Sequence, residues 1–582
     1  MQASFSAHTD SSDSPDEDFP SMKEVCLVDE PLFGKKQRDW GLGRLRSLVL
    51  VNCGLSAASC SQLATVLNTS PGLEELNLAR NPLGVGFETL VQPLLELSLK
   101  RVSFARTSIS TSIATALVPG LSAVTLLDMS NNSLGDAFIE ALARSWPSQL
   151  AHLYLAYNRF TAIQQLIAVT AGLSTLDLSH NPMPISSPLP FIATLRLRGL
   201  HIASSLPCET LSLGWSHLDA EIVPSSLIAL DCPAARLSAQ AIASLSLCVN
   251  MQRINLTGCG LGLAAGEVML ALPHLTHVLL GTNHMDTPCV MKVLTALSEC
   301  RQLLVLDLSD NPACNWDISA LSPVNTLEKL ILASIALPDG LAKFIQAQQS
   351  LAFLDLSKSG LNSQKLAEII SALRDLPLTE LHLSGNDFSE ANSAFPQIPT
   401  LQRIDLAGCH LTSCSLQSLC TFLPPSLTHL HLFNNPLGPT SLPAFPALQS
   451  LNLHKCELRN SGVELLSPCL SSKLQELRLG WNYLTAACVP LLASALPAGL
   501  EYLSLFENDL DDDRALRLVE ALPDRLESLD LGYTGLNNRV LQALLARISA
   551  LPHIQWCSLL GQTLSTEILS SLPNWPLVIV NQ

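Results

Sequence analysis

The chain repeats one eleven-residue phrase, Leu-x-x-Leu-x-Leu-x-x-Asn-x-Leu, along most of its length. The phrase is clear from Leu73 to Leu83, and it returns at 173–183, 427–437, 474–484 and 500–510. About 22 copies begin between residues 45 and 554, at a mean spacing of about 24 residues. A period of this length is typical of a solenoid, in which stacked repeats share one continuous core.

Each repeat combines a strand pattern with a helix pattern. The Leu-x-Leu part alternates with a period of two, which predicts a short strand with one buried face. The remainder often has helical spacing: in 362–373 the apolar residues recur at i, i+3, i+4 and i+7, Asn362 or Ser363 provides an N-cap, and Pro377 follows the end. The expected fold is an α/β solenoid of the horseshoe type, with a parallel β-sheet on the concave face and helices on the convex face.

The ninth position of the phrase usually holds a small polar residue. Among about 22 copies it is Asn in ten, Cys in four, and Ser or Thr in four. Because Cys53, Cys259, Cys409 and Cys456 take this loop position, we expect their thiols to be structural and reduced. Such cysteine use favours a reducing compartment. With no signal peptide and no apolar run of 18 residues, the sequence predicts a cytoplasmic or nuclear protein.

Five segments can be distinguished along the chain. Residues 1–21 are polar and acidic and are predicted to form a disordered tail. Ser14, with a proline and acidic residues after it, is a candidate phosphorylation site, although a solubilising tail is the simpler interpretation. Residues 22–44 form a degenerate repeat and N-terminal cap, 45–180 the first part of the array, and 238–582 the second part with a C-terminal cap.

The segment 181–237 departs from the regular repeat. Its copies begin at 173, 192, 208 and 227, so the steps shrink to 19, 16 and 19 residues, and prolines interrupt it. A step of this length leaves no room for a convex helix. We therefore expect extended convex segments here, which could divide the array into two lobes, act as a hinge, or provide a second binding site.

These repeats resemble the ribonuclease-inhibitor-like class of leucine-rich repeat proteins. The resemblance rests on strand–helix repeats in which copies of Asn-Pro-Leu type, such as 435–437, alternate with copies of Cys-x-Leu type, such as 456–458. It covers roughly residues 45–575. It implies the fold but leaves the function open, because the class includes inhibitors, GTPase-activating proteins, ubiquitin-ligase substrate receptors and innate-immune sensors. The irregular steps and the proline-rich segment depart from the inhibitor itself.

Catalytic signatures are scarce in this sequence. It contains no GxxxxGK[ST], HExxH or GxSxG motif. The glycine-rich turn at 258–266 resembles a dinucleotide-binding turn, but Cys259 occupies the ninth position of a repeat, so the repeat explains the turn. The net charge of −17 argues against a nucleic-acid partner and favours either a basic protein partner or simple solubility.

The variable side chains of the concave face come from four positions of the phrase, namely the third, fifth, seventh and eighth. Aspartate recurs at the fifth position, where solvated carboxylates are the simpler interpretation and an acidic, partner-attracting face is the alternative. These aspartates are Asp128, Asp177, Asp231, Asp307, Asp355, Asp405 and Asp530.

From residue 427 onward the variable positions become aromatic and basic, and we call this set the aromatic face. Large aromatic rings and arginine are typical of interface hot spots, so we predict a partner-binding site, with mutual packing of the rings as the alternative. Its members are His429, His431, Phe433, His454, Lys455, Arg478, Trp481, Tyr502, Phe506, Glu507, Tyr533 and Trp556.

A metal ion could reach His429, His431 and His454 on adjacent strands, but isolated surface histidines are far commoner, so neither a metal site nor a cofactor is predicted. The favoured function is a non-enzymatic protein-binding scaffold, with no nucleic-acid or membrane partner. The alternatives are a regulator of a small GTPase, for which no polar motif can be matched, and a ubiquitin-ligase substrate receptor, for which residues 1–44 are too short and too polar to hold an adaptor-binding motif.

Overall fold

The computed structural model describes residues 24–28, 45–219, 226–391, 395–562 and 578–579. The predicted tail at 1–21, its Ser14, and residues 29–44 of the predicted cap lie outside these ranges. The chain divides into two compact units, Met1–Ser244 and Leu245–Gln582, and the division falls shortly after the segment of short repeat steps. We call these the first and second units and describe each by itself.

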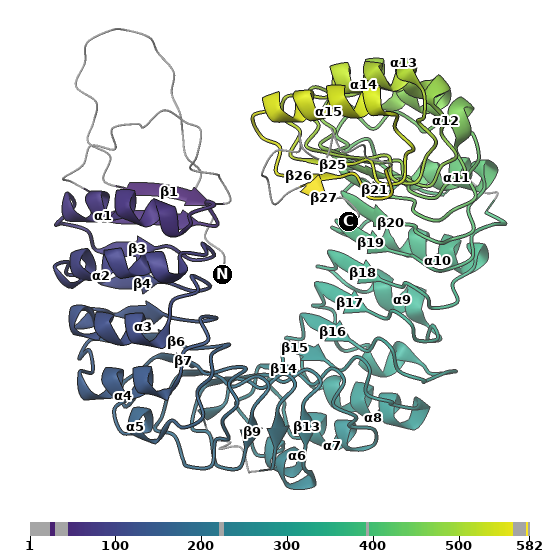
Figure 1. Cartoon of the computed structure of the whole chain (residues 1–582). Helices are drawn as coiled ribbons and strands as arrows, with labels where there is room; N and C mark the ends of the chain where they lie inside the picture. The colour runs from purple at the N-terminus through teal and green to yellow at the C-terminus, as the bar shows by residue number, and fades with distance from the viewer. Residues whose placement is uncertain (1–23, 29–44, 220–225, 392–394, 563–577, 580–582) are drawn as a thin grey trace, which may run out of the picture. The chain divides into compact units, whose positions relative to one another are not determined.

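Strands of the first unit pair side by side in the order of the chain, and every described pair is parallel. Helices α1–α5 lie along one side of these strands (Figure 1). The strands are β1 (Glu24–Val28), β2 (Ser47–Val51), β3 (Glu75–Asn77), β4 (Arg101–Ser103), β5 (Leu126–Asp128), β6 (His152–Tyr154), β7 (Thr175–Asp177), β8 (Thr194–Arg196), β10 (Thr210–Ser212) and β12 (Ala229–Asp231). The helices are α1 (Cys60–Asn68), α2 (Glu88–Leu95), α3 (Thr111–Leu117), α4 (Asp136–Arg144) and α5 (Gln164–Ile167), and α6 (Ala239–Leu245) ends at the division.

The second unit continues the same scheme of consecutive parallel strands. Its strands are β14 (Arg253–Asn255), β15 (His277–Leu279), β16 (Val305–Asp307), β17 (Lys329–Ile331), β18 (Phe353–Asp355), β19 (Glu380–His382), β20 (Arg403–Asp405), β21 (His429–His431), β22 (Ser450–Asn452), β23 (Glu476–Arg478), β24 (Tyr502–Ser504), β25 (Ser528–Asp530), β26 (Trp556–Ser558) and β27 (Val578–Ile579). Its helices are α7 (Ala264–Leu270), α8 (Thr287–Leu297), α9 (Leu341–Gln346), α10 (Ser363–Leu373), α11 (Ser413–Leu419), α12 (Arg459–Leu466), α13 (Val489–Ala495), α14 (Leu516–Ala521) and α15 (Asn538–Ala550). The predicted α/β leucine-rich repeat fold is confirmed.

Short repeat steps change the helix side of the first unit. Between α5 and α6, the described residues contain no α-helix. In its place the two-residue strands β9 (His201–Ile202), β11 (His217–Leu218) and β13 (Arg236–Leu237) form a second parallel sheet. The extended segments expected from the short steps are therefore present in the described part of 181–237.

Leucines of the phrase form the core between strands and helices. Leu474, Leu477, Leu479 and Leu484 of one repeat are at most 3% exposed, and the equivalent leucines of neighbouring repeats are similarly buried. Burying each such side chain contributes about 1.5–3 kcal/mol, so the stacked leucines supply most of the stabilisation of the array. The helices add an amphipathic layer: in α10, Leu366, Ile369 and Ile370 are buried on one side.

Asparagines at the ninth position connect neighbouring repeats through a buried hydrogen-bond ladder. Asn482 donates from Nδ2 to the carbonyls of Leu453 in the preceding repeat at 2.7 Å and of Leu479 in its own repeat at 2.9 Å. Its Oδ1 accepts from the backbone N–H groups of Cys456 at 2.9 Å and Leu458 at 3.3 Å. We call this arrangement, shared by Asn81, Asn132, Asn386, Asn435 and Asn508, the asparagine ladder.

Cysteine at the ninth position replaces part of this ladder. The Sγ atoms of Cys409 and Cys456 lie 3.2 and 3.1 Å from the carbonyl oxygens of Leu383 and Leu432 in the preceding repeat. Burial raises the pKa of the Cys456 thiol to about 12, which keeps it protonated as a hydrogen-bond donor. All 17 cysteines are free thiols.

Aspartates at the fifth position are half-buried, and they have a structural role that the expectation of solvated carboxylates did not include. The Oδ1 atoms of Asp128, Asp177, Asp307, Asp355, Asp405 and Asp530 each accept from the backbone N–H two residues later, at 2.8–3.2 Å. The carboxylate thereby satisfies a backbone donor where the strand ends and the chain turns. Burial raises the pKa of Asp128 and Asp307. Asp231 instead pairs with Arg198 and accepts from Ser212.

Replacing Asn482 by alanine should strongly destabilise the second unit. The change leaves the Leu453 carbonyl and the Cys456 and Leu458 N–H groups without their partner in a site that is 0% exposed. An unsatisfied buried group costs about 1–3 kcal/mol, so we expect a loss of about 3 kcal/mol or more in urea unfolding. The Asn482→Cys variant should lose less, because cysteine already serves this position elsewhere. Equal stability of the two variants would contradict this account of the ladder.

Candidate partner-binding face

The aromatic face lies on strands β21–β26 and on the turns that follow them. His429 and His431 lie on β21, Arg478 on β23, Tyr502 on β24 and Trp556 on β26. The remaining members follow the carboxyl ends of the strands and are Phe433, His454, Lys455, Trp481, Phe506, Glu507 and Tyr533. The regular parallel register places equivalent positions of successive repeats next to one another.

Four of these rings contact one another across the repeats, and we call them the aromatic row. The ring centroids of Phe433 and His454 are 5.4 Å apart, and those of His454 and Phe506 are 6.5 Å apart in a stacked arrangement. Tyr533 meets Phe506 edge to face at 5.6 Å. Mutual packing, the alternative to binding in the sequence analysis, therefore holds for part of the face.

Glycines make room for this row. A Cβ atom at Gly480 would meet Nδ1 of His454 at 2.6 Å and the carbonyl oxygen of Phe506 at 2.9 Å. A Cβ atom at Gly532 would meet Cδ2 of Phe506 at 2.9 Å. The rings of His454 and Phe506 can lie over the intervening repeats only because these repeats lack a side chain at the seventh position.

Packing leaves much of the aromatic surface open to solvent. Phe433 is 39% exposed, and Trp481 and Tyr533 are each 45% exposed. Tyr483, at the tenth position and outside the predicted set, is 68% exposed. Trp481 and Tyr533 both have a φ near 55°, the left-handed conformation that the eighth position adopts repeatedly in this chain. The backbone turn therefore fixes the direction in which the Cα–Cβ bonds of these two residues leave the surface.

Arg478 joins the aromatic face to a neighbouring group of acids. Its guanidinium lies 4.5 Å from the centroid of the Tyr502 ring and pairs with the Glu476 carboxylate. Glu476 also accepts from Ser450 Oγ at 2.7 Å. Burial raises the pKa of Glu476, but the hydrogen bonds from Ser450 and Arg478 outweigh it, so its net pKa is lowered and the side chain stays ionised near neutral pH.

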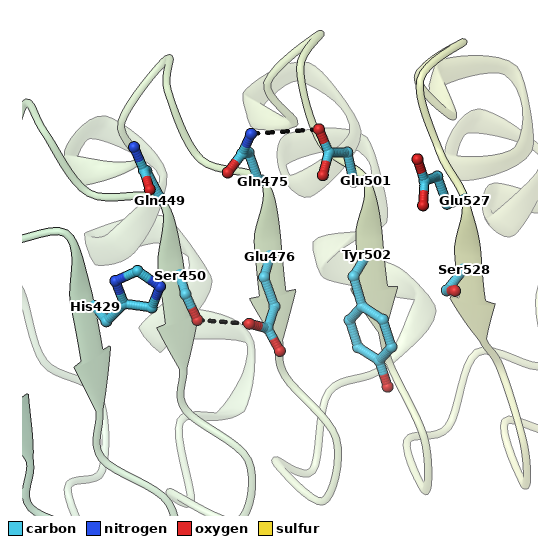
Figure 2. A pocket seen from close by; sticks show the side chains of 9 residues that line it. All are labelled: His429, Gln449, Ser450, Gln475, Glu476, Glu501, Tyr502, Glu527 and Ser528. Carbon is cyan, nitrogen blue, oxygen red and sulfur yellow. Dashed lines mark hydrogen bonds between the residues drawn. The ribbon is translucent and has the colours of Figure 1, made fainter. Parts of the chain in front are cut away.

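An open depression of about 300 Å³ lies across β21–β25 (Figure 2). Glu476, Glu501 and Glu527 give it a negative lining, and Gln475 donates to Glu501 at 3.3 Å. The other lining residues are His429, Gln449, Ser450, Tyr502 and Ser528. These three glutamates were not among the residues predicted from the sequence. Glu501 and Glu527 occupy the second position of the phrase, just before the strand. The recurrence of Gln or Glu at this position in successive repeats is the sequence pattern that could have predicted them.

His429, His431 and His454 do not converge on a common point. Among the described residues, the group of potential ligands that does converge lies in the first unit and contains none of these three. His429 Nδ1 instead lies 2.9 Å from Thr428 Oγ1, and His454 is part of the aromatic row. Burial, and then the positive charge of Arg478, lowers the pKa of His454, so this ring is neutral near pH 7.

The first unit carries a smaller aromatic group that the sequence analysis missed. Tyr157 and His180 stack with centroids 4.2 Å apart, and Trp215 lies 6.3 Å from His180. Tyr157 and Trp215 are 54% and 62% exposed. All three occupy the eighth position of their repeats, with Gly199 at that position of the repeat between His180 and Trp215, so the pattern at the eighth position through the whole array points to them.

Replacing Gly480 by alanine should disrupt the aromatic row. The new methyl group would overlap the His454 ring and the Phe506 carbonyl, and such overpacking typically costs about 1–3 kcal/mol. We expect a lower melting temperature and a shifted NMR signal of His454. Gly499→Ala is the matched control, because a Cβ atom there meets nothing within 4 Å. Unchanged His454 signals in Gly480→Ala would show that the row does not depend on this glycine.

Known proteins with similar sequences are leucine-rich repeat proteins. The chain is 27% identical to ribonuclease inhibitor of Sus scrofa over 383 residues, which cover 61% of this chain and 80% of that protein. It is 26% identical over 349 residues to human NACHT, LRR and PYD domains-containing protein 5, a match that covers 56% of this chain and 25% of that protein. No family model matches the chain.

Solved structures include a TLR13–ssRNA13 complex, to which the chain is 16% identical with a TM-score of 0.44, over 91% of this chain and 90% of that one. None of the described helices is long and apolar enough to cross a membrane. The repeats, the asparagine ladder and the sequence matches together identify the chain as a ribonuclease-inhibitor-like leucine-rich repeat protein, distantly related to ribonuclease inhibitor.

Proposed function

We propose that this protein is a non-enzymatic binding protein that captures a protein partner on the aromatic face of its second unit. One observation carries the proposal: exposed rings at Phe433, Trp481 and Tyr533 share a few consecutive repeats with a depression lined by glutamates. Isolated exposed aromatics are common on protein surfaces, whereas here several exposed rings follow the carboxyl ends of the same run of strands whose amino ends line the acidic depression.

The aromatic row suits such a role because its rings are already ordered. Aromatic anchors bury a large area while losing little side-chain entropy, and rings fixed by their neighbours lose still less. Phe506 packs between His454 and Tyr533, and the left-handed turn at the eighth position fixes the base of Trp481. The face therefore presents a preorganised surface, which favours affinity for a partner of complementary shape.

Charge favours a basic segment of that partner. Of the three glutamates in the depression, the carboxylate of Glu476 is paired with Arg478, while those of Glu501 and Glu527 accept from the uncharged side chains of Gln475 and Gln555. No lysine or arginine is among the lining residues. The chain as a whole carries a net charge of −17, so its long-range field would also attract a cation.

Distant relatives support a binding function rather than catalysis, since ribonuclease inhibitor is named for the enzyme class that it inhibits. The proposal therefore assigns no cofactor and no reaction to the chain. With 17 free thiols, the protein suits a reducing compartment, and we propose the cytoplasm or the nucleus as its location.

The double variant Trp481→Ala, Tyr533→Ala should lose partner binding while keeping its fold. Each hot-spot ring contributes about 2 kcal/mol or more, so the pair should lower affinity by about 1000-fold. The measurement is affinity purification with quantitative mass spectrometry, followed by titration of the purified partner. Trp215→Ala, which removes a still more exposed ring from the first unit, is the control and should bind as the wild type does. A partner retained by the double variant would place the binding site elsewhere.

Reversing two charges tests the electrostatic part separately. The variant Glu501→Lys, Glu527→Lys should slow association with the partner and remove most of the dependence of the association rate on ionic strength. Glu464→Lys, Glu520→Lys, on exposed helix positions, changes the net charge equally and is the control. Equal effects of the two variants would assign the attraction to the overall charge and not to the depression.

A further inference from the structure

Two histidines and one aspartate converge on the helix side of the first unit. Nε2 of His201 lies 3.0 Å from Oδ2 of Asp219, and Nε2 of His217 lies 3.0 Å from Oδ1 of the same carboxylate. One ligand atom from each of the three residues lies within 4.8 Å of the others. The two imidazole rings meet edge to face, with centroids 5.3 Å apart.

The backbone places these side chains together through the short repeat steps. His201 on β9 and His217 on β11 are direct partners in the second parallel sheet, and Asp219 follows β11. In longer repeats this side of the array is covered by helices, which would keep such side chains apart. The histidines occupy equivalent positions of consecutive short repeats, so their approach follows from the register.

We propose that His201, His217 and Asp219 form a binding site for Zn²⁺. Imidazole nitrogens and a carboxylate oxygen are ligands that zinc accepts, whereas Mg²⁺ and Ca²⁺ prefer oxygen ligands alone. Tetrahedral zinc with bonds of about 2.0 Å separates its ligand atoms by roughly 3.3 Å, close to the two 3.0 Å separations found here. Since the three ligand atoms already lie within 4.8 Å of one another, side-chain rotations would bring them to the zinc separation.

Exposure of the site indicates what the bound ion would do. The three side chains are 48–51% exposed, so a fourth ligand position faces solvent and is open to water or to a donor from another molecule. A half-exposed site does not exclude water as a catalytic pocket does, which favours a structural ion. By joining two repeats, zinc would reinforce β9 and β11, each of which has only two residues.

Simple ion pairing is the competing explanation. A protonated histidine beside a carboxylate gives the same distance, and either His201 or His217 alone would satisfy Asp219. What favours a shared ion is that one ligand atom of each of the three residues lies within 4.8 Å of the others, so that a single ion can reach both rings and the carboxylate. Arg236 on β13, which pairs in register with His217, adds positive charge nearby, and it would weaken the binding of a cation if its guanidinium approached the site.

Metal titration of the full-length protein tests the proposal. Chelator-treated, reduced protein is titrated with Co²⁺, whose absorption bands report its ligands, and Zn²⁺ is then used to displace the Co²⁺. We expect one Co²⁺ per chain with a spectrum free of thiolate charge transfer, and a higher melting temperature with Zn²⁺. Charge-transfer bands, or no binding at micromolar metal, would overturn the proposal, because the 17 free cysteines are the main rival ligands.

Single variants locate the site. Asp219→Asn, His201→Ala and His217→Ala should each weaken metal binding at least about tenfold, since even partners of metal ligands contribute that much. His274→Ala removes an exposed histidine from the second unit and should bind as the wild type does. Asp219→Asn keeps the side-chain shape, so its melting temperature without metal checks that the fold is intact. Unchanged affinity in all three variants would refute the site.

Discussion

The asparagine ladder is the interaction on which the rest of this structure depends. Each ladder side chain bonds simultaneously to its own repeat and to the one before it, as Asn482 does to Leu479 and Leu453. Leucine burial drives the repeats together but is non-directional, whereas the amide fixes the register between neighbours. With the register fixed, a given position of the phrase reaches the same place in every repeat. The aromatic row and the depression are consequences of that regularity.

Leucine spacing and the ninth position were enough to predict the fold, because both report directly on what must be buried. The aspartates show where this reasoning stops. Asp355 at the fifth position reads as a surface acid in the sequence, yet it bonds to the N–H of Ser357, a contact that requires knowledge of where the strand ends. Likewise, the choice between packing and binding for Phe506 depends on distances between repeats. The predicted members of the aromatic face are close together, but their role in binding stays a prediction.

The positions of the repeat fall into two groups, one buried in the core and one that varies from repeat to repeat. Positions filled by leucine and asparagine are buried and tolerate little change, while the seventh and eighth positions vary from glycine to tryptophan. The glycines at the seventh position are a partial exception. Gly480 occupies a variable position but is itself buried, and its lack of a side chain is what lets His454 and Phe506 approach. The arrangement of the rings on this face therefore depends on absent side chains as well as on large ones.

In the first unit, the short repeats bring polar side chains together on the helix side of the array. A helix normally isolates the convex side chains of one repeat from those of the next, because it fills the space between them. Where the step falls to 16 residues, extended segments pair directly, and side chains at equivalent positions come within bonding distance, as His201 and His217 do. Such a segment loses the apolar layer that a helix would bury, and two-residue strands provide few hydrogen bonds in exchange. A cross-repeat link through polar side chains is therefore of most use where the helices are missing.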